Sequence, residues 1–171
     1  MNEVTAVTVM AILPSQEDRL CLRKIFCQSK WRLDVSECLR GARPLLGAPR
    51  INVVVTDCQL PDGGWEDVLH EVERGPARTA PIIVVSRLAD ERLWAEVLNL
   101  RGYDVLATPF RADEVRWSIR SAYRHWRNNC MLSTHEGRTD ANHSLARSKA
   151  AAGGRNSSRM PPDVQQAGFT R

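Results

Sequence analysis

The chain of 171 residues is the right size for one folded domain with a short appendage. Its 43% hydrophobic and 26% charged residues describe an ordinary soluble globule, and no apolar run approaches the ~18 residues that a membrane span needs. The start has no basic segment before its short apolar stretch, which argues against a secretory signal, and the five cysteines form no CxxC pair typical of a zinc site. We therefore expect a cytoplasmic protein that does not associate with membranes.

The net charge of +4 is concentrated at the C-terminal end. Residues 130–171 carry six Lys or Arg against three acidic groups, which leaves 18 basic and 17 acidic groups, or +1, for residues 1–129. Gly, Ser, Asn, Arg and Ala dominate the end of the chain without an apolar period. The sequence thus predicts a domain over residues 1–129 and a disordered basic tail over residues 130–171. Because the domain is nearly neutral, we do not expect it to bind nucleic acid.

The first predicted strand, residues 5–13, is apolar enough to lie in the centre of a sheet. Ser15 follows with acidic residues behind it, a pattern typical of the start of a helix. Arg19 is expected to remain in solvent on this helix. The positions expected to face inward are Leu20, Leu22, Ile25 and Phe26.

The rest of the domain continues this alternation of strand and helix. The Val-Val-Val-Thr-Asp57 run has the β-branched residues of a strand buried on both faces, and the alternation of apolar and polar residues at 31–35 is typical of a half-exposed strand. Two more strands are expected at residues 81–86 and 104–107. The helices expected after the first one cover residues 37–47, a segment through Trp65 and Val72, residues 90–100, and residue 112 to about 128.

Five strands joined by such short helical connections predict an α/β fold, a flavodoxin-like, doubly wound, five-stranded parallel sheet with five helices. Asp57 then falls at the carboxyl end of its strand, where such sheets keep their ligand crevice. The loops after Leu13, Ser86 and Ala107 converge on the same edge. A carboxylate there is either a site residue or a solvated residue that begins the turn before Pro61.

Three segments in this order resemble the receiver domain of two-component response regulators, over residues 5–128. They are Val-Val-Val-Thr-Asp57 with Leu-Pro-Asp-Gly-Gly64 behind it, Ile-Ile-Val-Val-Ser86, and Gly-Tyr-Asp-Val-Leu-Ala-Thr-Pro109 with Phe110. The resemblance implies that Asp57 accepts a phosphoryl group from a histidine kinase and that Ser86 contacts that group. It also assigns a lysine position to Thr108.

The same resemblance implies an acidic pair that holds Mg²⁺, and its positions fall on Leu13 and Pro14, which cannot ligate a metal. Glu17 and Asp18 lie nearby, but their place in the first helical turn favours a capping role. We therefore predict no cofactor, and phosphorylation at Asp57 that is weak, independent of Mg²⁺ or absent.

Two other positions bear on this site. Arg87 follows Ser86, and its guanidinium either reaches the pocket and supplies the missing positive charge or lies on the surface. The aromatic residue that rotates as a switch in the family is replaced by Val105, and Tyr103 is expected two residues earlier on the same face.

The last helix carries arginines at helical spacing, which form either a solvated face or a docking surface. In the family the fourth helix, fifth strand and last helix form the output and dimer face. The predicted interaction face comprises Trp94, Arg116, Trp117 and Arg120.

Three hypotheses follow for the function. The first is a single-domain, receiver-like signalling protein, not an enzyme, that contacts a histidine kinase, another signalling protein or a second copy through the last helix. The second is a working phosphoacceptor in a phosphorelay. The third is a flavodoxin-like protein that binds a small molecule, although the chain lacks a GxGxxG or P-loop phosphate cradle.

Overall fold

The computed structural model describes residues 7–46, 50–75 and 80–131. A five-stranded parallel sheet forms its centre, in the order β2-β1-β3-β6-β7, which confirms the predicted flavodoxin-like α/β fold. Within the described ranges, no helix has the length and apolar character needed to cross a membrane. The strands of the sheet are β1 (Thr8–Ile12), β2 (Arg32–Ser36), β3 (Val53–Asp57), β6 (Ile82–Ser86) and β7 (Asp104–Ala107).

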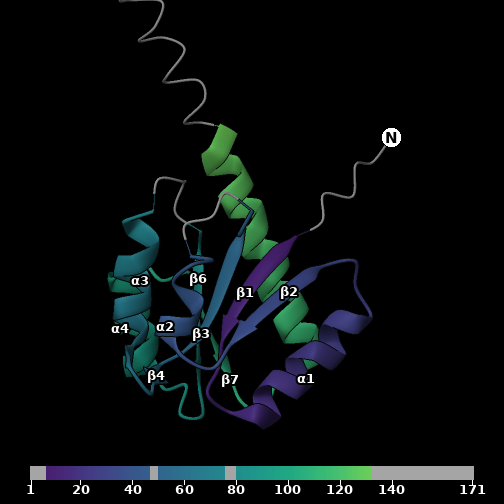
Figure 1. Ribbon diagram of the computed structural model, residues 1–171, viewed down its shortest axis with the longest axis horizontal. Coiled ribbons are helices and arrows are strands. Elements are labelled where there is room, and N and C mark those ends of the chain that lie inside the picture. The colour runs from purple at the N-terminus through teal and green to yellow at the C-terminus, as the bar shows by residue number, and fades with distance from the viewer. Residues whose placement is uncertain (1–6, 47–49, 76–79, 132–171) are drawn as a thin grey trace, which may run out of the picture. The chain divides into compact units, whose positions relative to one another are not determined.

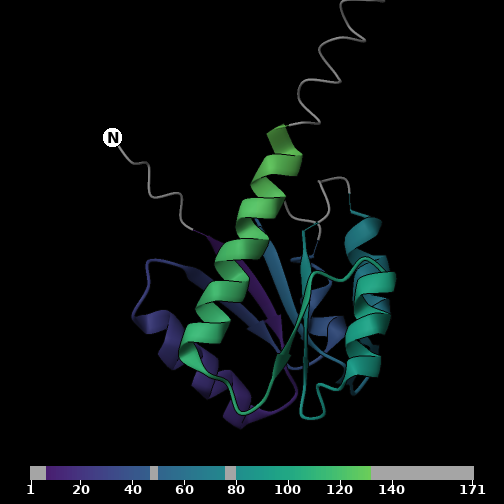
Figure 2. The same ribbon diagram turned by 180° about the vertical axis from the view of Figure 1, so that it is seen from behind.

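Helices cover both faces of the sheet, as Figures 1 and 2 show from opposite sides. Helix α1 (Gln16–Cys27) and the last helix (residues 112–131) pack on one face. The other face is covered by α2 (Leu39–Ala42), α3 (Trp65–Glu73) and α4 (Glu91–Asn99). The last helix continues to residue 131, into the range predicted to be a disordered tail, and the remainder of that range lies outside the described residues.

The valines of β3 explain why this strand lies in the middle of the sheet. Val53 and Val55 belong to the core on the α1 side, whereas Val54 belongs to the core on the α3 side, and none of the three is exposed. Full burial of one such side chain stabilises the fold by roughly 1.5–3 kcal/mol. This buried central strand therefore positions Asp57 at the carboxyl end of the sheet.

Capping side chains fix the ends of three helices. The Ser15 hydroxyl accepts a hydrogen bond from the Asp18 amide (3.2 Å), as the start signal of α1 predicts, and the Asp90 carboxylate accepts one from the Leu93 amide (2.8 Å) at the start of α4. Asp62 lies in the hairpin of β4 (Gln59–Leu60) and β5 (Gly63–Gly64) and caps α2 from outside that helix.

The predicted inward stripe of α1 was wrong at one position. Leu20 is 52% exposed, whereas the side chain of Arg19 is only 15% exposed. The reason is helical spacing: Arg19 precedes the buried Leu22 by three residues and therefore lies on the inward side, while Leu20 points away.

Candidate functional site

An open cleft of about 540 Å³ lies at the carboxyl edge of the sheet. Asp57 and Ser86, predicted from the sequence, both line it, because β3 and β6 are neighbours and their ends are in register. Thr108 does not line the cleft, although its amide donates to the Ser86 carbonyl (3.1 Å). The lining residues are Pro14, Ser15, Asp18, Asp57, Cys58, Gln59, Ser86, Arg87, Leu88, Asp90, Arg92, Leu93 and Glu96.

Asp57 serves both a turn and the cleft. Its side chain is half-buried, and its Oδ1 accepts a hydrogen bond from the amide of Gln59 (3.0 Å), which starts the chain reversal after β3. The two interpretations of Asp57 made from the sequence are thus compatible, because a turn-forming carboxylate keeps a second oxygen.

Ser86 is buried, and its hydroxyl is engaged with its neighbours. The hydroxyl oxygen accepts a hydrogen bond from the Leu88 amide (3.2 Å), and the hydroxyl also hydrogen-bonds the thiol of Cys58. Burial raises the pKa of Cys58, the Ser86 hydrogen bond opposes this shift, and the charge of Asp57 adds to it. The sequence did not single out Cys58 as a cleft residue, although its place directly after Asp57 could have indicated it.

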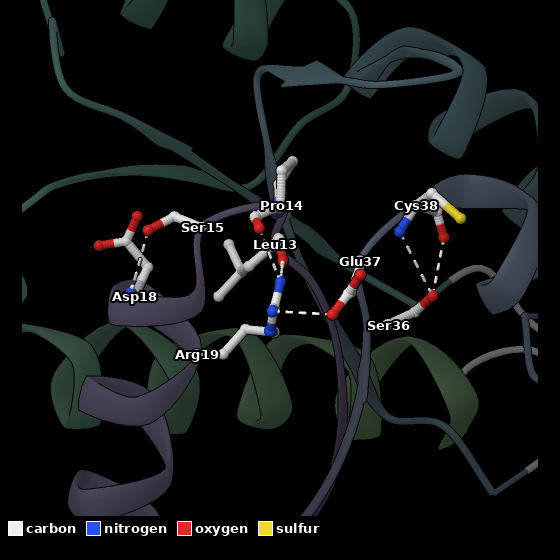
Figure 3. Close-up of polar contacts among 8 residues, drawn as sticks. All are labelled: Leu13, Pro14, Ser15, Asp18, Arg19, Ser36, Glu37 and Cys38. Atoms are coloured by element: carbon white, nitrogen blue, oxygen red, sulfur yellow. Dashed lines mark hydrogen bonds and ion pairs between the residues drawn. The ribbon is translucent and has the colours of Figure 1, made fainter.

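The first side of the cleft, which we call the α1 rim (residues 13–19), carries Leu13 and Pro14 at the positions of the implied acidic pair. The side chain of Leu13 is fully buried in the core beneath α1. The carbonyl oxygens of Leu13 and Pro14 both accept hydrogen bonds from Nη1 of Arg19, at 2.7 Å each (Figure 3). Nη2 of Arg19 pairs with Oε1 of Glu37 at 2.8 Å.

The residues present do not fit the Mg²⁺ site that the resemblance implies. Mg²⁺ needs oxygen ligands in a nearly octahedral arrangement. Leu13 and Pro14 supply no carboxylate, and their carbonyl oxygens are bound to Arg19. Asp18 lines the cleft with Asp57, but in the described ranges no group of three His, Cys, Asp or Glu side chains could hold a metal ion.

The opposite side of the cleft, the α4 rim (residues 86–96), carries charges of both signs, with Asp90 and Glu96 beside two arginines. Arg87 and Arg92 both line the cleft, and both are exposed. Leu88 between them is 80% exposed. Arg87 thus lies on the surface and also borders the pocket, so the two positions considered for it from the sequence are compatible. Arg92 was not singled out from the sequence, but the predicted helix start at Asp90 would have placed it in the first turn.

The position of the family's aromatic switch differs from the expectation. Val105 is buried against the α3 side of the sheet, whereas Tyr103 packs on the α1 side. The Tyr103 hydroxyl lies 2.8 Å from Oγ of Ser121, and its ring centroid lies 5.4 Å from that of His125. The two residues do not share a face because Tyr103 precedes β7, so the alternation of the strand does not include it.

The four residues of the predicted interaction face lie on two helices, α4 and the last helix. Trp94 is half-exposed on α4, on the opposite face of the sheet from the last helix. Arg116 donates to Oε1 of Gln28 (2.5 Å), and the guanidinium of Arg120 lies 5.8 Å from the ring centroid of Trp31, so both arginines contact the end of α1 and the residues after it. Trp117 is 68% exposed.

No family model and no curated protein matches this sequence. Solved structures do match. The signal receiver domain of an HD domain-containing protein from Pseudomonas fluorescens Pf-5 superimposes with a TM-score of 0.66 at 18% identity, over 77% of this chain and 98% of that chain. A receiver domain of a Francisella response regulator gives a TM-score of 0.60 at 21% identity, over 70% and 98%.

A third match is the receiver domain of a sensor histidine kinase from Pseudomonas aeruginosa PAO1, whose structure has a magnesium ion coordinated in the active site cleft. Its TM-score is 0.60 at 16% identity, over 70% of this chain and 98% of that chain. The chain therefore has the fold of response-regulator receiver domains, and its cleft lies at the carboxyl edge of that fold.

Proposed function

We propose that this chain is a receiver-like signalling protein of a two-component or phosphorelay system, cytoplasmic and acting by protein contact. We further propose that Asp57 undergoes weak or no Mg²⁺-dependent phosphorylation. One observation supports this most. Asp57 and Ser86 both line the cleft, whereas the acidic-pair positions hold Leu13 and Pro14, whose carbonyl oxygens accept hydrogen bonds from Arg19.

The chemistry of phosphoryl transfer explains why we expect phosphorylation of Asp57 to be slow. A carboxylate can attack phosphorus when the protein positions the groups and neutralises the developing charge. A metal ion contributes several kcal/mol of that stabilisation. Because about 1.4 kcal/mol corresponds to a factor of ten in rate, a cleft without metal ligands and with Thr108 at the lysine position should react slower by several orders of magnitude.

Exposed apolar side chains on α4 support the protein-contact part of the proposal. Trp94 and Leu98 are one helical turn apart and both half-exposed, and together they border a surface hollow of about 380 Å³. Tryptophan is enriched among residues that dominate interface energies. A histidine kinase or another signalling protein is the proposed partner, and a second copy of the chain at the last helix is the alternative.

Acetyl phosphate with Mg²⁺, read by intact mass, tests the phosphorylation part. We expect little addition of a phosphoryl group to the wild-type chain. Asp57→Asn removes the proposed acceptor, and Asp18→Asn is the matched control because it removes another carboxylate of the same cleft. Rapid Mg²⁺-dependent addition that Asp57→Asn abolishes would overturn the proposal, whether or not Asp18→Asn preserves it.

The second candidate function is a working phosphoacceptor that needs no metal ion. Arg87 and Arg92 favour it, because guanidinium groups at the α4 rim could pair with a phosphoryl group without a metal. Addition that proceeds equally in EDTA and is lost in the double variant Arg87→Ala, Arg92→Ala would identify this mechanism.

A further inference from the structure

A second cavity, of about 410 Å³, lies at the amino edge of the sheet. Pro81, which lines it, comes directly before β6, and residues 101–103, which also line it, lead into β7. The cleft of Asp57 lies at the other ends of these strands. The volume is within the range of small-molecule sites in proteins, roughly 300–1,000 Å³.

Two ring side chains line this cavity side by side. The ring centroids of Tyr103 and His125 lie 5.4 Å apart, with 41° between the ring planes. The Tyr103 hydroxyl lies 2.8 Å from Oγ of Ser121, and the side-chain amide of Asn129 hydrogen-bonds Nε2 of His125 at 3.0 Å. Hydrogen bonds thus hold both rings in place, and ring faces of this kind pack well against another planar ring.

The cavity also has a charge of each sign. Glu73 at the end of α3 and Arg101 after α4 both line it, and both are exposed. Among the described residues, neither takes part in an ion pair. A guanidinium can bind a carboxylate through two parallel hydrogen bonds, and a carboxylate accepts hydrogen bonds from an ammonium group. The two groups are therefore available to a ligand that carries both charges.

Arg101 has a backbone conformation that favours glycine. Its φ is +70°, the left-handed region, at the end of α4, where glycine is the usual residue because a Cβ is strained there. Residues held in such conformations are frequent at ligand sites, where the side chain compensates for the strain. The helix dipole of α4 also favours a cation at this end, but that role alone predicts no effect on ligand binding.

We propose that this cavity binds a free aromatic amino acid. The ring of the ligand packs on Tyr103 and His125, its carboxylate pairs with Arg101, and its ammonium group pairs with Glu73. An aromatic acid or an aromatic amine would leave one of the two charges without a partner. The site lies at the opposite edge of the sheet from Asp57, so the proposal does not rest on the proposed function.

Titration of the full chain, followed by its amide NMR signals, tests the proposal with four probes. L-phenylalanine has all three groups, 3-phenylpropionate lacks the ammonium group, phenethylamine lacks the carboxylate, and L-alanine lacks the ring. Millimolar L-phenylalanine should shift the amide signals of Gly102, Tyr103 and His125. The other three probes should bind about tenfold more weakly or less, because each leaves one part of the cavity unused.

Arg101→Gly removes the guanidinium, and the variant should fold because glycine suits the left-handed backbone. It should weaken the binding of L-phenylalanine about tenfold or more and leave that of phenethylamine unchanged. Arg74→Gly is the matched control, since Arg74 is an exposed arginine at the end of α3 that does not line the cavity. It should leave the affinity for L-phenylalanine unchanged.

Glu73→Gln tests the other charge. It should weaken the binding of L-phenylalanine and leave that of 3-phenylpropionate unchanged, because this probe has no ammonium group. Asp57→Asn should leave the affinity for L-phenylalanine unchanged, which separates this site from the cleft at the carboxyl edge.

Three results would overturn the proposal. The first is the absence of any shift of the Gly102, Tyr103 and His125 amides at millimolar L-phenylalanine. The second is an affinity for L-phenylalanine that Arg101→Gly and Glu73→Gln both leave at the wild-type value. The third is equal affinity for L-alanine and L-phenylalanine, which would show that the rings do not contribute.

Discussion

The two rims of the cleft differ in what holds them. The α1 rim is fixed by the fully buried Leu13 and by three hydrogen bonds from Arg19. The α4 rim is exposed at Arg87 and Leu88, and local hydrogen bonds hold it, from the Leu88 amide to Ser86 and from the Asp90 amide to the Leu88 carbonyl (2.9 Å).

The two rims should therefore have different roles: the α1 rim holds the shape of the cleft, and the α4 rim faces a ligand or partner. The buried Leu13 and the hydrogen bonds of Arg19 hold the backbone of the α1 rim, so this rim contributes shape. The α4 rim presents two arginines and an exposed leucine to solvent beside Asp57. Any discrimination between ligands or partners at this cleft should therefore depend on the α4 rim.

The largest effect is expected from an attempt to rebuild the acidic pair on the α1 rim. Leu13→Asp places a carboxylate at a fully buried position in the core. A buried charge without a partner costs about 3–5 kcal/mol, and urea denaturation should show a loss of that size. Mg²⁺ should not recover it.

Pro14→Asp is the control for this variant, because Pro14 is only half-buried and borders the cleft. It should fold with much smaller loss. A Leu13→Asp chain that keeps wild-type stability without metal would contradict the burial of Leu13, and one that regains stability with Mg²⁺ would show that the α1 rim can become a metal site.

The sequence predicted the fold well because the signals were local. Buried β-branched runs such as the one before Asp57 and helix starts such as Ser15 require no knowledge of distant residues. The meeting of Asp57 with Ser86 followed from the order of parallel strands. The contacts of Arg19 were not predictable in this way, because its partners lie in the loop before α1 and in the segment after β2. The polarity of an arginine suggested solvent, whereas three oxygen partners compensate for its burial.

A moderate effect is expected at Ser86, the buried end of the α4 rim. Ser86→Ala removes the acceptor of the Leu88 amide and should lower the free energy of unfolding by about 1 kcal/mol. It also removes the hydrogen bond that opposes the upward shift of the Cys58 pKa, so that pKa should rise further. Urea denaturation and the pH dependence of thiol alkylation measure the two effects, and an unchanged alkylation profile would contradict the Ser86 contact.

The hydrogen bonds from the Leu39 and Arg40 amides to Asp62 should affect the stability of the chain at acid pH. Two backbone amides, of Arg40 and Leu39, lower the pKa of Asp62 below its usual 3.8. A carboxyl whose pKa is lowered on folding contributes stability above its unfolded value and loses it as the pH falls through the folded value. Asp62→Asn should therefore flatten the decline in the urea midpoint below about pH 4. A decline as steep as in the wild type would show that the cap does not form in solution.

A smaller effect is expected at Cys58, which lies between the two rims. Burial raises the pKa of its thiol and the charge of Asp57 adds to this, so Asp57→Asn should lower that pKa. Because the thiolate is the reactive form, alkylation of Cys58 near neutral pH should become faster, and the exposed Cys27 provides the internal reference. Site-resolved mass spectrometry measures both rates. A rate ratio that Asp57→Asn leaves unchanged would mean that the two side chains do not interact.

The smallest effect is expected at Leu88, the most exposed point of the α4 rim, where 80% of the residue is accessible. Leu88→Ser removes little buried apolar surface and keeps the backbone amide that binds Ser86. The free energy of unfolding should change by no more than about 0.5 kcal/mol. Leu93→Ser in the same rim is the control, since Leu93 packs against the core on the α3 side and its loss should cost clearly more. If Leu88→Ser destabilises the chain as much as Leu93→Ser does, the α4 rim is packed in solution, and the contrast between a fixed rim and an open one does not hold.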